Sequence, residues 1–235
     1  MNVCMAHRGW SGRAPENTMA AFLLAFQEPR IQAVELDVQI SKDGVPVVIH
    51  DFTLDRTTNG TGFVYQSTYR ELSQLDAGHG ERIPTLEEVL AAAKGRCYVN
   101  IELKTAGDLY PGIEKKVLDL VKHHQMEDEV CMTSFDHIVI SKIKALGSRV
   151  KTGLIFSGMP IFIREQLREA GASILSMDYR FLTQRYAEEV ISQGYSLVAW
   201  TVNEANMIER VMKMHPKIQI CTNHPERMFP FVKGL

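Results

Sequence analysis

Short apolar runs alternate along the chain with longer segments in which apolar residues recur every three or four positions. The short runs are typical of buried strands, and the periodic segments are typical of amphipathic helices. Strands are predicted near residues 3–7, 33–39, 98–103, 130–134, 151–156, 173–177, 196–201 and 218–222. Helices are predicted to follow them at 16–28, 84–94, 112–124, 136–146, 161–170, 183–193, 203–214 and 224–233. Eight strand–helix units predict a closed, parallel (β/α)8 barrel.

The length of the chain agrees with one such barrel. It has 235 residues, and a (β/α)8 barrel commonly needs 200 to 250. We therefore expect a single domain over residues 1–235. An open, doubly wound sheet is the alternative architecture, but no G-x-G-x-x-G loop follows the first predicted strand.

Two segments depart from the regular alternation. A ninth strand-like run, Val45 to His50, follows Asp43-Gly44, and Asp-Gly between apolar runs is a hairpin signal. The hairpin would return His50 to the mouth of the barrel. The stretch 52–83 is rich in Thr, Gly and Asp, and we expect it to form a small insertion over that mouth.

Composition limits the classes of partner and compartment. The net charge is -2, without a basic stretch, so we expect no nucleic-acid binding. No apolar run approaches the roughly 18 residues of a membrane span, so no stable membrane insertion is expected. A strand begins by Val3, which leaves no room for a signal peptide. The four isolated cysteines are expected to be buried, reduced thiols: Cys4, Cys97, Cys131 and Cys221. These features predict a cytoplasmic protein, and no pattern predicts its oligomeric state.

The candidate chemistry lies where the predicted strands end. Active sites of such barrels form at the carboxyl ends of the strands. The polar residues found there are His7, Arg8, Glu35, Asp37, His50, Asp51, Asn100, Glu102, Lys104, Trp200 and Asn203. They belong to five segments that a barrel would bring to one mouth.

Three of these carboxylates are predicted to face the inside of the barrel. Side chains two apart on a strand share a face, so Glu35 and Asp37 point the same way, opposite their apolar neighbours. Glu102 has the same setting on the next parallel strand. Three inward carboxylates repel one another, and one divalent cation would resolve the conflict. An all-oxygen ligand set favours Ca²⁺ or Mg²⁺. Ordinary ion pairs with Arg8 and Lys104 are the alternative.

The other residues at the mouth suit acid–base work and anion binding. His7 and His50 could each give or take a proton near neutral pH, although His50 could instead be a metal ligand or either could be structural. Arg8 and Lys104 could bind a phosphate, for which Arg offers a bidentate fork. Trp200 could wall a ligand pocket or pack in the core.

Three further polar residues are explained by helix starts rather than by contact with a ligand. Asn203 is expected to cap the following helix rather than contact a ligand. Glu16 and Asn17 are mainly helix-start signals, with a supporting role at the site as the alternative.

Several ordered motifs together resemble the glycerophosphodiester phosphodiesterase family. They are His7-Arg8-Gly9, Pro15-Glu16-Asn17-Thr18, Glu35-Leu36-Asp37, Gly44-Val45-Pro46-Val47-Val48-Ile49-His50-Asp51, Leu54-Asp55-Arg56-Thr57-Thr58, Pro84-Thr85-Leu86-Glu87-Glu88-Val89-Leu90, Asn100-Ile101-Glu102-Leu103-Lys104 and Trp200-Thr201-Val202-Asn203. The resemblance spans nearly the whole chain. It implies a phospholipase-C-like TIM barrel that hydrolyses small glycerophosphodiesters to sn-glycerol 3-phosphate and an alcohol.

The resemblance also implies roles for residues. Those matching Glu35, Asp37 and Glu102 ligate a divalent metal, often Ca²⁺ or Mg²⁺. Those matching His7 and His50 are the acid–base pair, of which we favour His7 as the base. The residue matching Arg8 holds the phosphate. One departure is Asn223, which stands where the family commonly has Asp near the last strand, so a charge-based role for this position is in doubt.

Other functions remain open from the residues alone. Attack by a neighbouring glycerol hydroxyl, giving a cyclic phosphate, and direct attack by water fit equally well. A related lyase would stop at the cyclic phosphate. A catalytically silent binding barrel would be expected to lack one of the histidines or carboxylates. A metal-free sugar isomerase barrel would leave the two histidines and Arg8 unexplained.

Overall fold

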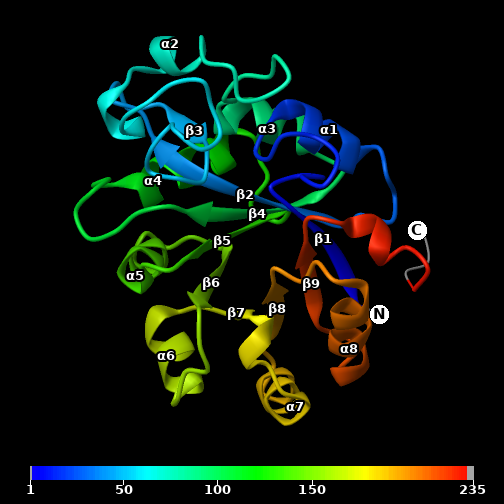
Figure 1. Cartoon of the computed structure of the whole chain (residues 1–235). Helices are drawn as coiled ribbons and strands as arrows, with labels where there is room; N and C mark the ends of the chain where they lie inside the picture. Colours follow the sequence, from blue (N-terminus) through cyan, green and yellow to red (C-terminus); the bar gives the residue numbers. More distant parts are fainter. Residues whose placement is uncertain (1, 232–235) are drawn as a thin grey trace.

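Eight parallel strands close into a barrel in the computed structural model, which describes residues 2–231 (Figure 1). The barrel strands are β1 (Val3–His7), β2 (Ala33–Ile40), β4 (Tyr98–Leu103), β5 (Val130–Ser134), β6 (Lys151–Phe156), β7 (Ile174–Asp178), β8 (Ser196–Trp200) and β9 (Gln219–Thr222). Each pairs with the next, and β1 pairs with both β2 and β9, which closes the ring. The predicted (β/α)8 barrel is confirmed.

Seven α-helices of the described chain form a ring outside the barrel (Figure 1). They are α1 (Met19–Phe26), α3 (Leu86–Ala93), α4 (Ile113–His123), α5 (His137–Ala145), α6 (Ile163–Ala170), α7 (Gln184–Ser192) and α8 (Ala205–Met214). Thr85 and Glu88 form the capping box at the start of α3. Helix α1 starts later than predicted because Thr18 is its N-cap, its side chain accepting a hydrogen bond from the Ala21 amide.

The predicted helix at 224–233 is wrong as an α-helix over the described residues. Only a 3-10 turn, η3 (Pro225–Arg227), follows β9, and residues 232 and 233 lie outside the described range. Pro230 explains the difference, since proline lacks an amide donor and disfavours the helical conformation of the residue before it.

The predicted hairpin is present after β2. Strand β3 (Pro46–Val48) runs antiparallel to β2, with Val38 opposite Val48 and Ile40 opposite Pro46. Gly44 has a φ of +86° in the turn, a conformation that glycine adopts without strain. His50 follows the strand in a turn instead of ending it.

The insertion at 52–83 contains η1 (Val64–Gln66) and the short helix α2 (Tyr69–Leu72). It covers the end of the β2–β3 hairpin in Figure 1. A separate apolar cluster anchors it, formed by Val47, Ile49, Leu54, Val64, Leu72 and Ile83. The insertion is therefore packed against the segment that carries His50.

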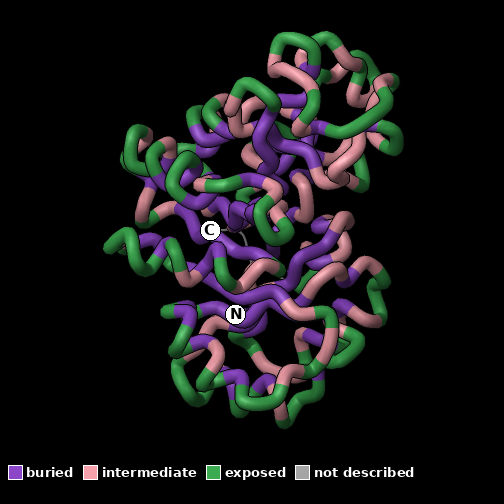
Figure 2. Tube along the Cα trace, turned by 90° about the vertical axis from the view of Figure 1, so that its left-hand side faces the viewer, coloured by how far each residue is buried: buried purple, intermediate pink, exposed green. Residues whose placement is uncertain are grey.

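The two faces of the strands have different surroundings, as predicted. On β2, Val34, Leu36 and Val38 belong to the large core between barrel and helices. Strand β2 is buried over its whole length, and Figure 2 shows continuous buried stretches through the middle of the molecule. A smaller apolar layer fills the barrel interior, formed by Met5, Ala33, Cys131, Ile174, Val198 and Cys221. The polar inward residues of β2 and β4 lie further along these strands, towards their carboxyl ends.

All four cysteines are buried and free, as predicted. Among the described helices, none combines the length and apolarity that crossing a membrane requires.

Candidate active site

A cavity of about 570 Å³, counting its open rim, lies at the carboxyl ends of the barrel strands. Seven of the eight predicted site residues line it: His7, Arg8, Glu35, His50, Glu102, Lys104 and Trp200. Asp37 is the exception, because it is 1% exposed and contacts Arg8 and Lys104, which do line the cavity. The barrel therefore brings the whole predicted set to one mouth.

The three carboxylates form one buried cluster. Asp37 on β2 is directly opposite Glu102 on β4, and Glu35 precedes Asp37 on the same face. One oxygen from each of the three lies within 4.8 Å of the others. Burial raises the pKa of Glu35 well above its usual value and that of Glu102 to about 7. Burial acts in the same direction on Asp37, but Lys104 and Arg8 outweigh it and hold the Asp37 pKa low.

Arg8 and Lys104 are the cations packed against this cluster. Arg8 Nε is 3.1 Å from Asp37 Oδ2, and the Arg8 amide donates a hydrogen bond to Glu35 Oε2 over 3.1 Å. Lys104 Nζ lies 2.5 Å from Glu102 Oε1 and 3.4 Å from Asp37 Oδ1. The ordinary ion pairs expected as an alternative are thus formed. With all three carboxylates ionised, two cations would leave one negative charge uncompensated, and the raised pKa values of Glu35 and Glu102 reflect that excess.

The oxygens of the cluster fit a hard divalent ion. Glu35 Oε1 is buried, accepts no hydrogen bond and pairs with no cation of the described chain. Asp37 Oδ1 and Glu102 Oε1 are also buried and lie 3.4 and 2.5 Å from the Lys104 ammonium, and among the described residues no other group donates a hydrogen bond to them. Converging, buried carboxylate oxygens are the ligand set that Ca²⁺ and Mg²⁺ use.

His7 is oriented by a residue from the far end of the chain. Its Nδ1 lies 2.6 Å from Asn223 Oδ1, and because an amide oxygen only accepts, Nδ1 carries the hydrogen. Nε2 is then free to accept a proton, and it lies 3.8 Å from Glu35 Oε2. Burial and the neighbouring Arg8 lower the pKa of His7 to about 4, so its ring is neutral at pH 7.

His50 has a different environment. Its Nδ1 is 2.6 Å from Asp51 Oδ1, and Arg56 of the insertion pairs with the same carboxylate. The Arg56 hydrogen bonds lower the pKa of Asp51, which keeps it ionised beside the imidazole. Burial still lowers the pKa of His50 below its usual value. The side chain of His50 is 31% exposed and that of His7 is 15% exposed, so the His50 ring is more accessible to solvent.

Comparisons with known proteins agree with this arrangement. The sequence pattern of the glycerophosphoryl diester phosphodiesterase family matches residues 7–227. The chain belongs to this family. It is 39% identical to the glycerophosphodiester phosphodiesterase of Caldanaerobacter subterraneus subsp. tengcongensis, over 98% of both chains. It is 32% identical to that of Bacillus subtilis, over 99% of this chain and 87% of the relative.

Solved structures show the same fold. An Oleispira antarctica phosphodiesterase, in complex with the product sn-glycerol-3-phosphate, superposes with a TM-score of 0.91 at 31% identity, covering 98% of this chain and 96% of that one. The glycerophosphodiester phosphodiesterase of Thermotoga maritima gives a TM-score of 0.79 at 25% identity, covering 98% of each chain.

The prediction that Asn203 caps the following helix is wrong. Its Oδ1 accepts hydrogen bonds from the Asn223 amide and from the Thr222 hydroxyl, at 2.9 and 3.3 Å. Helix α8 has Glu204 as its N-cap residue, without a side-chain capping bond. Asn203 therefore supports the residue that orients His7.

Glu16 and Asn17 have the supporting role that was the alternative for them. Asn17 Nδ2 donates a hydrogen bond to Asp37 Oδ2 over 2.8 Å. Glu16 accepts hydrogen bonds from Arg8 and from Arg56, and so joins the insertion to the mouth.

Trp200 packs edge-on against Phe135, with ring centroids 5.6 Å apart, and lines the cavity.

Gln39 is a supporting residue that the sequence interpretation missed. It is fully buried, and its side-chain NH₂ lies within 3.1 Å of the carbonyls of Ile49, His50 and Asp51. Its own oxygen accepts a hydrogen bond from the Tyr110 hydroxyl over 2.9 Å. Gln39 is two residues beyond Asp37 on the same strand, so the alternation of faces could have identified it as inward.

The Gln39 contacts predict a stability effect. Replacing Gln39 with Met keeps the size of the side chain but leaves the carbonyls of the His50 turn without a donor. We expect the free energy of unfolding to fall by about 1–3 kcal/mol, measured by chemical denaturation. The control is Gln66→Met, at an exposed position of the insertion. Equal stability of the two variants would mean that Gln39 does not hold this turn.

Proposed function

We propose that the chain hydrolyses glycerophosphodiesters to sn-glycerol 3-phosphate and an alcohol, and that the reaction requires one divalent cation, Ca²⁺ or Mg²⁺. The observation that carries this proposal is the single cavity in which an acidic cluster, two cations and two histidines converge. Membership of the family supports the reaction class, and the product held by the Oleispira relative supports the identity of the phosphorylated product.

Glu35, Asp37 and Glu102 would hold the cation in this proposal. When bound, it would supply Lewis-acid polarisation of the phosphate and stabilise the charge of the transition state. The charge balance supports this assignment. With its three carboxylates ionised, the buried cluster with Arg8 and Lys104 carries one net negative charge, which would repel an anionic substrate. A divalent ion reverses that sign, and a phosphodiester monoanion then restores neutrality.

Arg8, Lys104 and Trp200 are the proposed substrate contacts. The two cations line the cavity and lie within ion-pair distance of the carboxylate cluster. They would bind the non-bridging oxygens, where negative charge concentrates. The Trp200 ring offers an apolar wall for the glycerol or the leaving group.

His7 is the proposed base and His50 the proposed acid. The neutral His7 ring presents an unprotonated Nε2 to the cavity, which suits removal of a proton from the attacking hydroxyl. His50 lies beside an ionised Asp51, which favours the protonated ring against the lowering effect of burial and so suits protonation of the leaving alkoxide. The attacking group is either the glycerol hydroxyl next to the phosphate, giving a cyclic phosphate that water then opens, or water itself.

The test is release of sn-glycerol 3-phosphate from glycerophosphocholine and glycerophosphoethanolamine. EDTA should abolish the release, and Ca²⁺ or Mg²⁺ should restore it, which also identifies the ion. His7→Ala, assayed in parallel with the preferred ion, should be slower by roughly 10²–10⁴ fold, the usual contribution of a general base.

The same assay separates the alternatives. Accumulation of a cyclic phosphate, seen by phosphorus NMR, would assign a lyase instead of a hydrolase. Absence of turnover with every ion and both substrates would contradict the proposal and favour a silent binding barrel.

A localisation in the cytoplasm is proposed from the sequence alone.

The contact between His7 and Asn223 predicts a pH effect. In Asn223→Asp, a carboxylate next to the ring would stabilise imidazolium and raise the pKa of His7. Because the base must be neutral, the acidic limb of the kcat/KM profile should move to higher pH, by roughly 1–3 pH units. Asn59→Asp adds the same charge on the insertion and should leave the limb in place. A limb that is unmoved, or that moves to lower pH, in Asn223→Asp would contradict the assignment of His7.

A further inference from the structure

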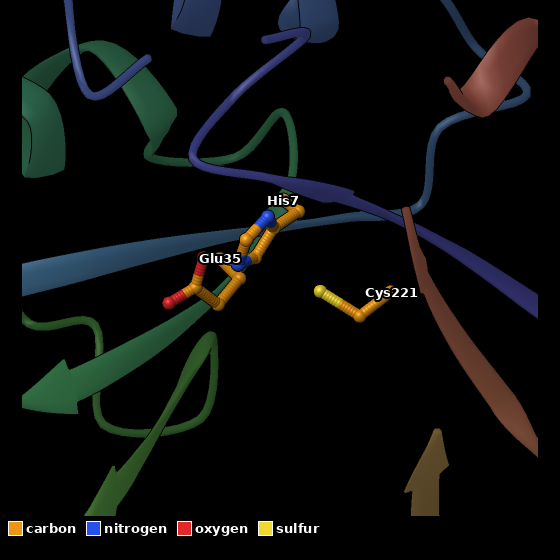
Figure 3. A group of neighbouring side chains, drawn as sticks. All are labelled: His7, Glu35 and Cys221. Atoms are coloured by element: carbon orange, nitrogen blue, oxygen red, sulfur yellow. Dashed lines mark ion pairs between the residues drawn. The ribbon is translucent and has the colours of Figure 1, made fainter. Parts of the chain in front are cut away.

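Cys221 lies beside the acid–base machinery and has no part in it. Figure 3 shows its sulfur pointing from β9 towards the His7 ring and Glu35. Cys221 Sγ, one imidazole nitrogen of His7 and one carboxylate oxygen of Glu35 all lie within 4.8 Å of one another. Cys221 lines the active-site cavity although it is only 2% exposed. An ion that enters the cavity can therefore reach the sulfur, which lies one layer of side chains before His7 and Glu35 along the barrel strands.

The donor atoms of this trio differ in kind from those of the acidic cluster. The cluster offers oxygens alone, whereas the trio offers one nitrogen, one oxygen and one sulfur. Ca²⁺ and Mg²⁺ prefer oxygen ligands, but Zn²⁺ and related ions combine His, carboxylate and thiolate readily. Three protein ligands with the fourth position open to the cavity is a common arrangement for such an ion.

The spacing of the trio also suits a tetrahedral ion. Zinc holds its ligands at about 2.0–2.3 Å, so its ligand atoms are roughly 3.5 Å apart. His7 Nε2 and Glu35 Oε2 are already 3.8 Å apart. Glu35 Oε1 is buried without a hydrogen-bond or ion-pair partner in the described chain, which leaves it available to a cation. Asn223 fixes the His7 ring from its other nitrogen, as a metal-bound histidine requires.

We propose that His7, Glu35 and Cys221 form a second metal site, specific for thiophilic divalent ions such as Zn²⁺ and Cd²⁺, whose occupation inhibits the enzyme. Binding would displace the thiol proton of Cys221 to water and form a metal–sulfur bond. It would engage the nitrogen of His7 that acts as base and a carboxylate of the catalytic cation site. The inhibition rests on the proposed function, whereas the binding does not.

Cadmium binding to the full-length chain tests the site directly. A Cd²⁺–thiolate bond has an ultraviolet charge-transfer absorption, so titration with Cd²⁺ reports on sulfur ligation without any assay of activity. The wild type should show a saturable band with one ion per chain. Cys221→Ala should lose the band. Cys131→Ala is the matched control, because Cys131 is a free, buried thiol of the same interior apolar layer and should leave the band intact.

Two further variants distinguish loss of the sulfur ligand from misfolding of the protein. Cys221→Ser keeps the size of the side chain and should also lose the band, with a circular dichroism spectrum like that of the wild type. His7→Ala keeps the thiol and should weaken Cd²⁺ binding by at least about tenfold. A band of unchanged affinity in folded Cys221→Ala or Cys221→Ser, or no band in the wild type, would overturn the site.

Activity then tests the inhibition separately. In saturating Ca²⁺ or Mg²⁺, Zn²⁺ should inhibit the wild type and Cys131→Ala. The same degree of inhibition of Cys221→Ala should require at least tenfold more Zn²⁺. The inhibition of each protein is measured relative to its own uninhibited rate. Equal inhibition of all three would overturn the regulatory claim. Sulfur-dependent Cd²⁺ binding in a protein without phosphodiesterase activity would instead contradict the proposed function and leave the second site standing.

Discussion

Burial of three carboxylates within 4.8 Å of one another is the constraint on which the rest of the barrel mouth depends. Isolated charges are costly to remove from water, and like charges at this range raise that cost. The surrounding residues offset part of this cost. Arg8 and Lys104 supply positive charge, while the Arg8 amide and the Asn17 side chain donate hydrogen bonds to Glu35 and Asp37. The remaining imbalance is the reason to expect a divalent cation.

A chain of ion pairs connects this cluster to the insertion. Arg8 joins Asp37 to Glu16, Glu16 joins Arg8 to Arg56, and Arg56 joins Glu16 to Asp51. Asp51 in turn contacts His50. The two histidines are therefore supported in different ways, His7 by Asn223 at the end of the barrel and His50 by the insertion. This difference in support provides the physical basis for giving them opposite roles.

Much of this arrangement could be predicted from the sequence, because it follows from local periodicity. Alternation on β2 and β4 was enough to place Glu35, Asp37 and Glu102 on one inward face, and Asp43-Gly44 was enough to predict the hairpin that precedes His50. The features of the site that could not be predicted in this way depend on contacts distant in sequence. Asn203 was assigned to a cap because its partner, Asn223, is 20 residues away. The segment 224–233 is a separate case, because Pro230 is visible in the sequence: a helix is predicted there, but only the 3-10 turn η3 forms in its described part.

Calorimetric titration of Ca²⁺ or Mg²⁺ into the metal-free chain, compared with Glu35→Gln and Glu102→Gln, tests the central claim most directly. These variants keep the shape of the side chains and remove one negative charge each. If the buried cluster is the cation site, the wild type binds one ion per chain and both variants lose that binding while remaining folded. Binding of equal affinity and stoichiometry in all three proteins would contradict the account.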